Sequence, residues 1–229
     1  MTDPSRSTLG QPRSTTRHAI ASATLLVTIL VVAVGALGLA IRVGGPPAVD
    51  LLLPSAVMAW YPPAATALFD ATGGLPIFAA VMLSGAATAA VARRPDIAVS
   101  FVLGLCGEIP SALVKLIVDR PRPPASTEIE AFVTAASYPS GHTVRAVLMA
   151  GLVVSAIGWR HRSTLVRSVA VVVGLAFVAA VGLARIASGE HWPTDVLGGL
   201  LLGAAWLTVC VTVAAWLDDR RRDRLTAEP

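Results

Sequence analysis

The stretch that decides the fold is His191–Leu217, HWPTDVLGGLLLGAAWLTVCVTVAAWL. Between Val196 and Leu217 it carries no charged residue, and roughly 20 apolar residues suffice for an α-helix to cross a bilayer. His191 and Asp195 stand at its N-terminal end, beside a proline suited to the first position of a helix. The stretch therefore predicts a membrane-spanning helix that begins with polar, chemically reactive side chains.

The composition of the whole chain also indicates a membrane protein. Of the 229 residues, 55% are hydrophobic and only 14% are charged, whereas a soluble domain carries about 25% charged residues. Six apolar segments are long enough to be considered as spans: Ala19–Ile41, Leu75–Ala92, Ile97–Val118, Thr143–Ile157, Leu165–Ala184 and Val196–Leu217. We predict an all-α fold, a six-transmembrane-helix bundle at residues 19–217 between a basic tail (1–18) and a charged tail (218–229).

The arginines outside these segments predict an orientation. Six spans place four groups of them on one side of the membrane: Arg6, Arg13 and Arg17; Arg93 and Arg94; Arg160, Arg162 and Arg167; Arg220, Arg221, Arg222 and Arg224. Because cytoplasmic loops carry an excess of basic residues, we expect this side and both termini to be cytoplasmic. The protein is then integral to a membrane, expected to be a bacterial plasma membrane, and its other loops face outward.

Residues 44–74, between the first two spans, contain apolar runs broken by prolines, with Trp60 and Tyr61 beside Pro62. Such runs predict short helices that lie in the outer membrane interface. Two interpretations stay open, a flap or entrance beside a functional site and a packed external loop.

Two polar groups at the outward ends of the predicted spans are suited to binding an anion. In the first, Lys115 precedes Arg120 and Arg122, whose flanking prolines stiffen the backbone and pre-organise the guanidinium groups for phosphate oxygens. The second is Pro-Ser-Gly-His at residues 139–142, where Ser140 is a good N-cap and the following amides attract anions at a helix N-terminus.

The third group combines Arg185, His191 and Asp195. A carboxylate four residues after a histidine can hold one imidazole nitrogen and leave the other as a nucleophile. With the cations and His142, this inventory suits phosphoryl transfer, in which fixed donors hold the charged oxygens, one histidine attacks and the other protonates the leaving oxygen. No His, Cys and carboxylate set has the spacing of metal ligands, so no metal is expected.

The three groups resemble the three signature motifs of the type 2 phosphatidic acid phosphatase superfamily. Lys115 through Arg122-Pro123 matches Lys-x6-Arg-Pro, residues 139–142 match Pro-Ser-Gly-His, and Arg185, His191 and Asp195 match Ser-Arg-x5-His-x3-Asp. Six spans with outward sites are similar to the bacterial integral-membrane lipid phosphatases of that family.

The resemblance implies a role for each residue. His191 would be the nucleophile that forms a phosphohistidine, Asp195 would orient it, and His142 would be the general acid. The phosphate would be bound by Lys115, Arg122, Ser140, Gly141 and Arg185. The resemblance implies neither a metal nor another cofactor.

The function expected from this resemblance is hydrolysis of a lipid phosphate monoester or diphosphate at the outer face. Polyprenyl diphosphate, phosphatidylglycerophosphate and phosphatidate are the candidate substrates. Two alternatives stay open, a lipid phosphotransferase that uses the same site and a non-catalytic lipid-phosphate binding or transport protein. The expected partners are the lipid and the bilayer, with no nucleic acid, and the oligomeric state is left open.

Two positions depart from the family pattern. Ala184 stands where serine is usual, so a hydrogen bond is lost there. Asp119 stands where glycine is common and adds a negative charge beside Arg120.

Two further charges, Glu108 and Arg145, fall inside predicted spans. Glu108 is seven residues before Lys115 and therefore on the same helix face, while Arg145 lies about one turn deeper than His142. Either the two form a buried ion pair beneath the site, which we favour, or Arg145 binds the second phosphate of a diphosphate.

Overall fold

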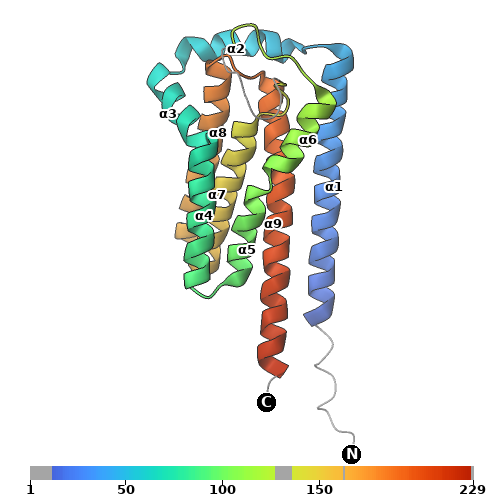
Figure 1. Ribbon diagram of the computed structural model, residues 1–229, viewed down its shortest axis with the longest axis vertical. Coiled ribbons are helices and arrows are strands. Elements are labelled where there is room, and N and C mark those ends of the chain that lie inside the picture. The colour runs from blue at the N-terminus through green and yellow to red at the C-terminus, as the bar shows by residue number, and fades with distance from the viewer. Residues whose placement is uncertain (1–11, 127–135, 162, 228–229) are drawn as a thin grey trace, which may run out of the picture.

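The protein is all-helical in the part that its structure, a computed structural model, describes: residues 12–126, 136–161 and 163–227. These residues contain no strand and form α1 (Pro12–Gly44), α2 (Ala48–Trp60), α3 (Pro63–Gly73), α4 (Leu75–Val91), α5 (Pro95–Leu105), α6 (Glu108–Val118), α7 (Gly141–Arg160), α8 (Thr164–Ala187) and α9 (Pro193–Ala227). Figure 1 shows α1 and α4 to α9 running along the long axis, with α2 across the end opposite the termini. The predicted fold class is confirmed.

In the described part, five helical segments are long and apolar enough to cross a membrane: α1, α5 with α6, α7, α8 and α9. The sixth predicted span corresponds to α4, which has only 17 residues but also runs along the bundle (Figure 1). Helices α2 and α3 meet at 114°, and Leu51 and Leu52 of α2 are 60% and 71% exposed, as expected for a helix in the membrane interface. The bundle and the short helices between its first two spans therefore agree with the prediction.

The predicted span Ile97–Val118 is confirmed as a segment long and apolar enough to cross a membrane, but its helix is interrupted. The chain turns between α5 and α6, where the Gly107 amide donates to the Gly104 carbonyl at 3.0 Å, three residues back. Pro110 lacks the N–H that would continue the i→i−4 ladder, so the helix is interrupted at this point. The two halves still form a single crossing over Pro95–Val118.

The last helix extends beyond the predicted span. Helix α9 continues past Leu217 to Ala227, so the charged tail begins as helix. Within this extension Arg222 Nη2 donates to Asp218 Oδ2 at 2.8 Å, a pairing across one helical turn.

Helix α9 is central to the bundle and packs against α1, α5 and α7. The core of the bundle, to which α4 also contributes, is apolar and includes Phe78, Met82, Leu148, Leu152 and Leu202, each no more than 5% exposed. By contrast, Leu25 and Val32 on α1 are both 62% exposed. An apolar core inside an apolar outer surface is the arrangement of a protein whose solvent is lipid.

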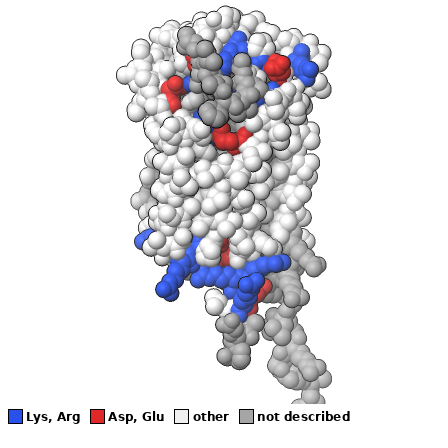
Figure 2. All heavy atoms as spheres, viewed as in Figure 1, with Lys and Arg blue, Asp and Glu red and all other residues white. Residues whose placement is uncertain are grey.

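Charged side chains are concentrated at the two ends of the bundle, and Figure 2 shows a wide uncharged zone between them. At the end that carries the termini, Arg221 donates to the Arg93 carbonyl at 2.9 Å and Arg94 lies 3.7 Å from Asp218. Arg6 and Arg162, on which the orientation was also predicted, lie outside the described residues, as do the side chains of Arg13 and Arg17.

Candidate active site

The three polar groups of the sequence meet at the end of the bundle that α2 covers (Figure 1). Backbone hydrogen bonds join them: the Ser137 amide donates to the Arg120 carbonyl at 2.8 Å, and the Ser140 amide donates to the Asp195 carbonyl at 3.0 Å. Within the third group, the His191 amide donates to the Arg185 carbonyl at 3.1 Å. The starts of α7 and α9 and the end of α8 are thereby held side by side.

His142, at the start of α7, faces several of these charges. The charges of Arg185, Arg145 and Lys115 act on its ring, as does His191. The residue is 7% exposed, and its Nδ1 has no hydrogen-bond partner in the described part of the chain. A buried imidazole nitrogen facing cations is well placed to meet an anionic ligand.

His191 and Asp195 form the pair that their spacing predicts. The distance from His191 Nδ1 to Asp195 Oδ2 is 3.4 Å, and both side chains are fully buried. This is longer than the usual 2.7–3.2 Å. Asp195 Oδ2 also accepts from the Trp192 amide at 2.9 Å, and its other oxygen, Oδ1, accepts from Arg120 Nη1 at 2.5 Å. Arg120 therefore contacts the carboxylate behind the histidine.

The cations of the first group are held by loop residues. Lys115, 4% exposed, donates through Nζ to the Ala136 carbonyl at 2.9 Å. Arg122 donates to the Glu190 carbonyl at 3.2 Å and lies 3.6 Å from its carboxylate, which also accepts from the Ser126 hydroxyl. Glu190 was not among the predicted site residues, although its position directly before His191 was a signal.

Arg185 is fully buried and pairs with Asp70 of α3, a carboxylate that is 38% exposed. Asp70 therefore uses part of the hydrogen-bonding capacity of the Arg185 guanidinium group, which the family resemblance assigns to phosphate binding. It belongs to the segment that the sequence analysis could interpret only as a flap or a packed loop.

Ser140 stands at the N-cap of α7, but its hydroxyl does not cap the helix. It accepts a hydrogen bond from the Thr143 hydroxyl at 3.1 Å, and no side-chain cap to a helix amide is formed. At Gly141 a Cβ would lie 3.2 Å from Arg145 Nη2, so glycine allows this guanidinium to lie against the loop.

Glu108 and Arg145 form an ion pair. Arg145 Nε lies 3.0 Å from Glu108 Oε1 and Nη2 lies 3.5 Å from Oε2, while Nη1 donates to the Gly73 carbonyl at 3.2 Å. The Arg145 side chain is 10% exposed and that of Glu108 is 34% exposed. The pair is therefore only half-buried, because Glu108 lies at the break between α5 and α6.

The two departures from the family pattern have different consequences. Asp119 ends α6 in the left-handed conformation, with φ 46°, where glycine is the least strained residue and aspartate is among the better tolerated alternatives. Ala184 is fully buried in α8.

Among the described residues, no three His, Cys, Asp or Glu side chains are grouped as they would be around a metal ion.

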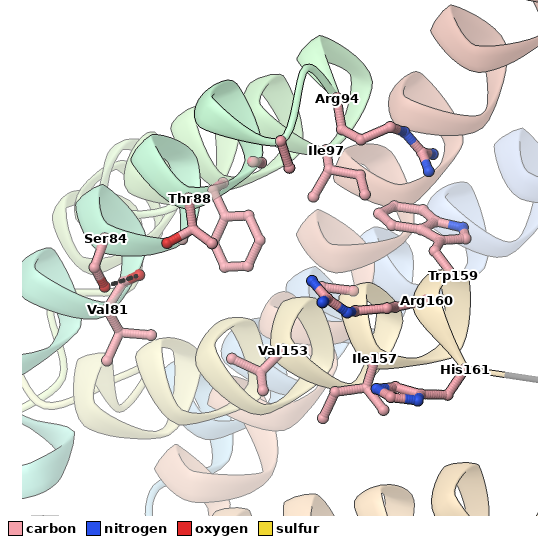
Figure 3. Close-up of a pocket in the computed structure, with 15 residues that line it drawn as sticks. Val81, Ser84, Thr88, Arg94, Ile97, Val153, Ile157, Trp159, Arg160 and His161 are labelled. Atoms are coloured by element: carbon pink, nitrogen blue, oxygen red, sulfur yellow. Dashed lines mark hydrogen bonds between the residues drawn. The ribbon is translucent and has the colours of Figure 1, made fainter. Parts of the chain in front are cut away.

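A cavity of about 430 Å³ between α4, α5 and α7 is lined by Val81, Ile97 and Val153, with Arg160 and His161 beside it (Figure 3). Arg160 is eighteen residues from the histidine at position 142, about 27 Å along α7, so this cavity is separate from the candidate site.

Comparison with known proteins agrees with this geometry. Residues 77–219 match the model of the PAP2 superfamily, and the chain belongs to that family. The fold is similar to the crystal structure of a transmembrane PAP2-type phosphatidylglycerolphosphate phosphatase from Bacillus subtilis, with a TM-score of 0.66 and 19% identity over 85% of this chain and 96% of that one. The family and the class of enzyme, a membrane lipid phosphatase, are those that the three motifs predict.

Proposed function

We propose that the protein hydrolyses a lipid phosphate ester or diphosphate through a phosphohistidine intermediate at the outer face of the membrane. The observation that carries this proposal is the buried His191–Asp195 pair, joined through its backbone to the Ser140 loop that leads into His142. A fixed cationic site at a helix N-terminus stabilises the charge that develops on the transferred phosphoryl group.

The reaction would proceed in two displacements. Because Asp195 holds Nδ1 of His191, Nε2 attacks phosphorus, a nitrogen–phosphorus bond forms and the bond to the leaving oxygen breaks. His142 gives its proton to that oxygen and then takes one from the water that hydrolyses the phosphohistidine. Inorganic phosphate and a dephosphorylated lipid leave. Lys115, Arg122, Ser140, Gly141 and Arg185 would hold the phosphate oxygens.

A lipid tail has a suitable place beside the site. An apolar cavity of about 370 Å³ lies between α4, α7 and α8 and is lined by Ile77, Met149 and Phe177. The cavity is also lined by Thr72, which directly precedes Gly73. The Gly73 carbonyl accepts a hydrogen bond from Arg145. A chain in this cavity would lie in the membrane while its head group meets the cations, which favours phosphatidylglycerophosphate, phosphatidate or a polyprenyl diphosphate over a soluble phosphate ester.

The orientation is part of the proposal. The arginines at the end bearing the termini favour a cytoplasmic location for that end in a bacterial plasma membrane, with the histidines outside. A fluorescent protein fused after Pro229 should fold and fluoresce inside the cell. Intact spheroplasts should hydrolyse an externally added, membrane-impermeant short-chain analogue of phosphatidate.

Phosphate release by purified protein tests the function. In detergent with a chelator present, the wild type should release phosphate from at least one of the three lipids, and His191→Ala should abolish the release. His161→Ala, at the opposite end of α7, is the matched control and should keep wild-type activity. A labelled phosphoenzyme that is labile to acid should accumulate in the wild type and in His161→Ala but not in His191→Ala. Loss of activity in both variants, or in neither, would overturn the proposal.

A second function, transfer of the phosphoryl group to another lipid, uses the same residues. Product analysis with a labelled donor lipid separates the two, because a transferase places the label on a second lipid and a phosphatase releases it as inorganic phosphate.

A further inference from the structure

One carboxylate that lies outside the residues matched by the family model is connected by hydrogen bonds to the proposed catalytic residues. Asp50 lies in the first turn of α2, before the matched range 77–219, and is fully buried. An ionised side chain is rarely buried in this way unless hydrogen bonds or opposite charges compensate it. In Asp50 both oxygens are compensated, and all the partners belong to the site.

Both carboxylate oxygens of Asp50 bind Thr194 at the start of α9, the helix that carries Asp195. Asp50 Oδ1 accepts from the Thr194 backbone amide at 2.9 Å, and Oδ2 accepts from the Thr194 hydroxyl at 2.6 Å. The early amides of a helix have no partner within it and attract negative charge. Asp50 therefore acts as a cap for α9 supplied by a different helix.

Asp50 Oδ2 is also connected to His191, through Arg120 and Asp195. Asp50 Oδ2 accepts from Arg120 Nη2 at 2.6 Å, and Arg120 Nη1 donates to Asp195 Oδ1 at 2.5 Å. The guanidinium group is 5% exposed and lies 5.2 Å from the centre of the Trp192 ring. A continuous buried chain of charges thus runs from Asp50 through Arg120 and Asp195 to His191.

The charges in this chain explain why Asp50 is needed. If Arg120 had Asp195 as its single carboxylate partner, it would draw the negative charge of Asp195 away from the imidazole. Asp50 balances Arg120, so Asp195 Oδ2 keeps its capacity to hold Nδ1 and to stabilise the positive charge that builds up on His191 during attack.

We propose that Asp50, acting through Arg120 and Thr194, is a positioning residue for the Asp195–His191 pair, which makes α2 an essential part of the active site. This inference rests on the proposed function, since it concerns the orientation of the proposed nucleophile. Asp50 contacts neither the reacting atoms nor the five residues to which the family resemblance assigns the phosphate, and Arg120, which the sequence suggested for an anion, instead binds Asp50 and Asp195.

Steady-state kinetics of Asp50→Asn test the inference. We expect kcat to fall about 10- to 100-fold, the range seen when partners that orient functional imidazoles are removed, with KM nearly unchanged. In an Asp195→Asn background the same change should lower kcat less than twofold, because its effect passes through Asp195. Thr194→Val keeps both charges and the backbone cap but removes two hydrogen bonds of the hydroxyl, which accepts from Arg120 Nη1 at 2.8 Å and donates to Asp50 Oδ2 at 2.6 Å. It should lose at least about 3- to 10-fold, the worth of a single hydrogen bond.

Asp96→Asn is the matched control, because it also removes a buried aspartate from an arginine pair, 2.6 Å from Arg94, at the opposite end of the bundle. It should lose stability without loss of kcat. Wild-type kcat in a folded Asp50→Asn protein, or an equal loss in the Asp195→Asn background, would overturn the inference. If Asp50→Asn does not fold, wild-type kcat in Thr194→Val would overturn it. Activity that survives His191→Ala would instead overturn the proposed function.

Discussion

The Glu108–Arg145 pair allows a prediction in which the two single substitutions are unequal. Glu108→Gln removes the negative charge opposite the Arg145 guanidinium, whose side chain is 10% exposed and whose Nη1 keeps its hydrogen bond to the Gly73 carbonyl. Removing one partner of a buried pair costs 3–5 kcal/mol, and we expect about 3 kcal/mol here. Arg145→Met leaves Glu108, which is 34% exposed and can be hydrated, so we expect about 1 kcal/mol.

Thermal unfolding in detergent measures this difference. For a domain of this size 1 kcal/mol corresponds to about 2–4 °C in Tm, so Glu108→Gln should lower Tm by about 6–12 °C and Arg145→Met by about 2–4 °C. The double variant should resemble Arg145→Met, because it leaves no buried charge without a partner. Arg222→Met, which breaks the exposed pair with Asp218, should change stability by at most about 0.5 kcal/mol.

Two results would refute this reasoning. Additive losses in the double variant would mean that Glu108 and Arg145 contribute independently. Unchanged Tm in Arg145→Met, together with loss of activity toward a diphosphate lipid but not a monophosphate lipid, would instead support Arg145 as the ligand of a second phosphate. The latter outcome would also identify the preferred substrate class.

Two further predictions concern α3, the short helix that contains Asp70 and Gly73. A Cβ at Gly73 would lie 2.9 Å from Val181 Cγ1 and 3.1 Å from His142 Cδ2, so Gly73→Val should displace both side chains and lower kcat at least tenfold. Gly158→Ala, with nothing within 4 Å, should leave kcat unchanged. Unaltered kinetics in a folded Gly73→Val protein would contradict the position of His142. Asp70→Asn removes the carboxylate from Arg185, so a substrate phosphate no longer competes with it and KM should fall severalfold. A rise in KM would mean that Asp70 orients Arg185 for the substrate and does not compete with it.

The sequence alone was sufficient for the features that depend on local pattern. The uncharged length of Val196–Leu217 predicts a span. The spacing of His191 and Asp195 predicts their pairing, because a carboxylate in the first turn of a helix can reach a side chain just before that helix. The seven-residue spacing from Glu108 to Lys115 placed the glutamate beneath the site, because residues at this spacing share a helix face.

Other features of the site come from contacts between residues far apart in the chain. Asp50 and Thr194 are separated by 144 positions, and Asp70 and Arg185 by 115, so no periodicity or motif relates them. A lone aspartate in the apolar run after Pro47 was a signal, because such acids are costly in a membrane without a partner. Its partner could not be inferred from the sequence, since the position of α2 depends on the 114° bend between α2 and α3. That bend is a product of packing.

The sequence by itself determined that this protein spans a membrane and which side chains form its three motifs, because hydrophobic length and helical spacing are local properties. Only the tertiary structure decided that α2 and α3 supply carboxylates to two arginines of the site. Those ion pairs depend on the packing of separate helices, and that packing is set by the whole set of side chains rather than by any one segment.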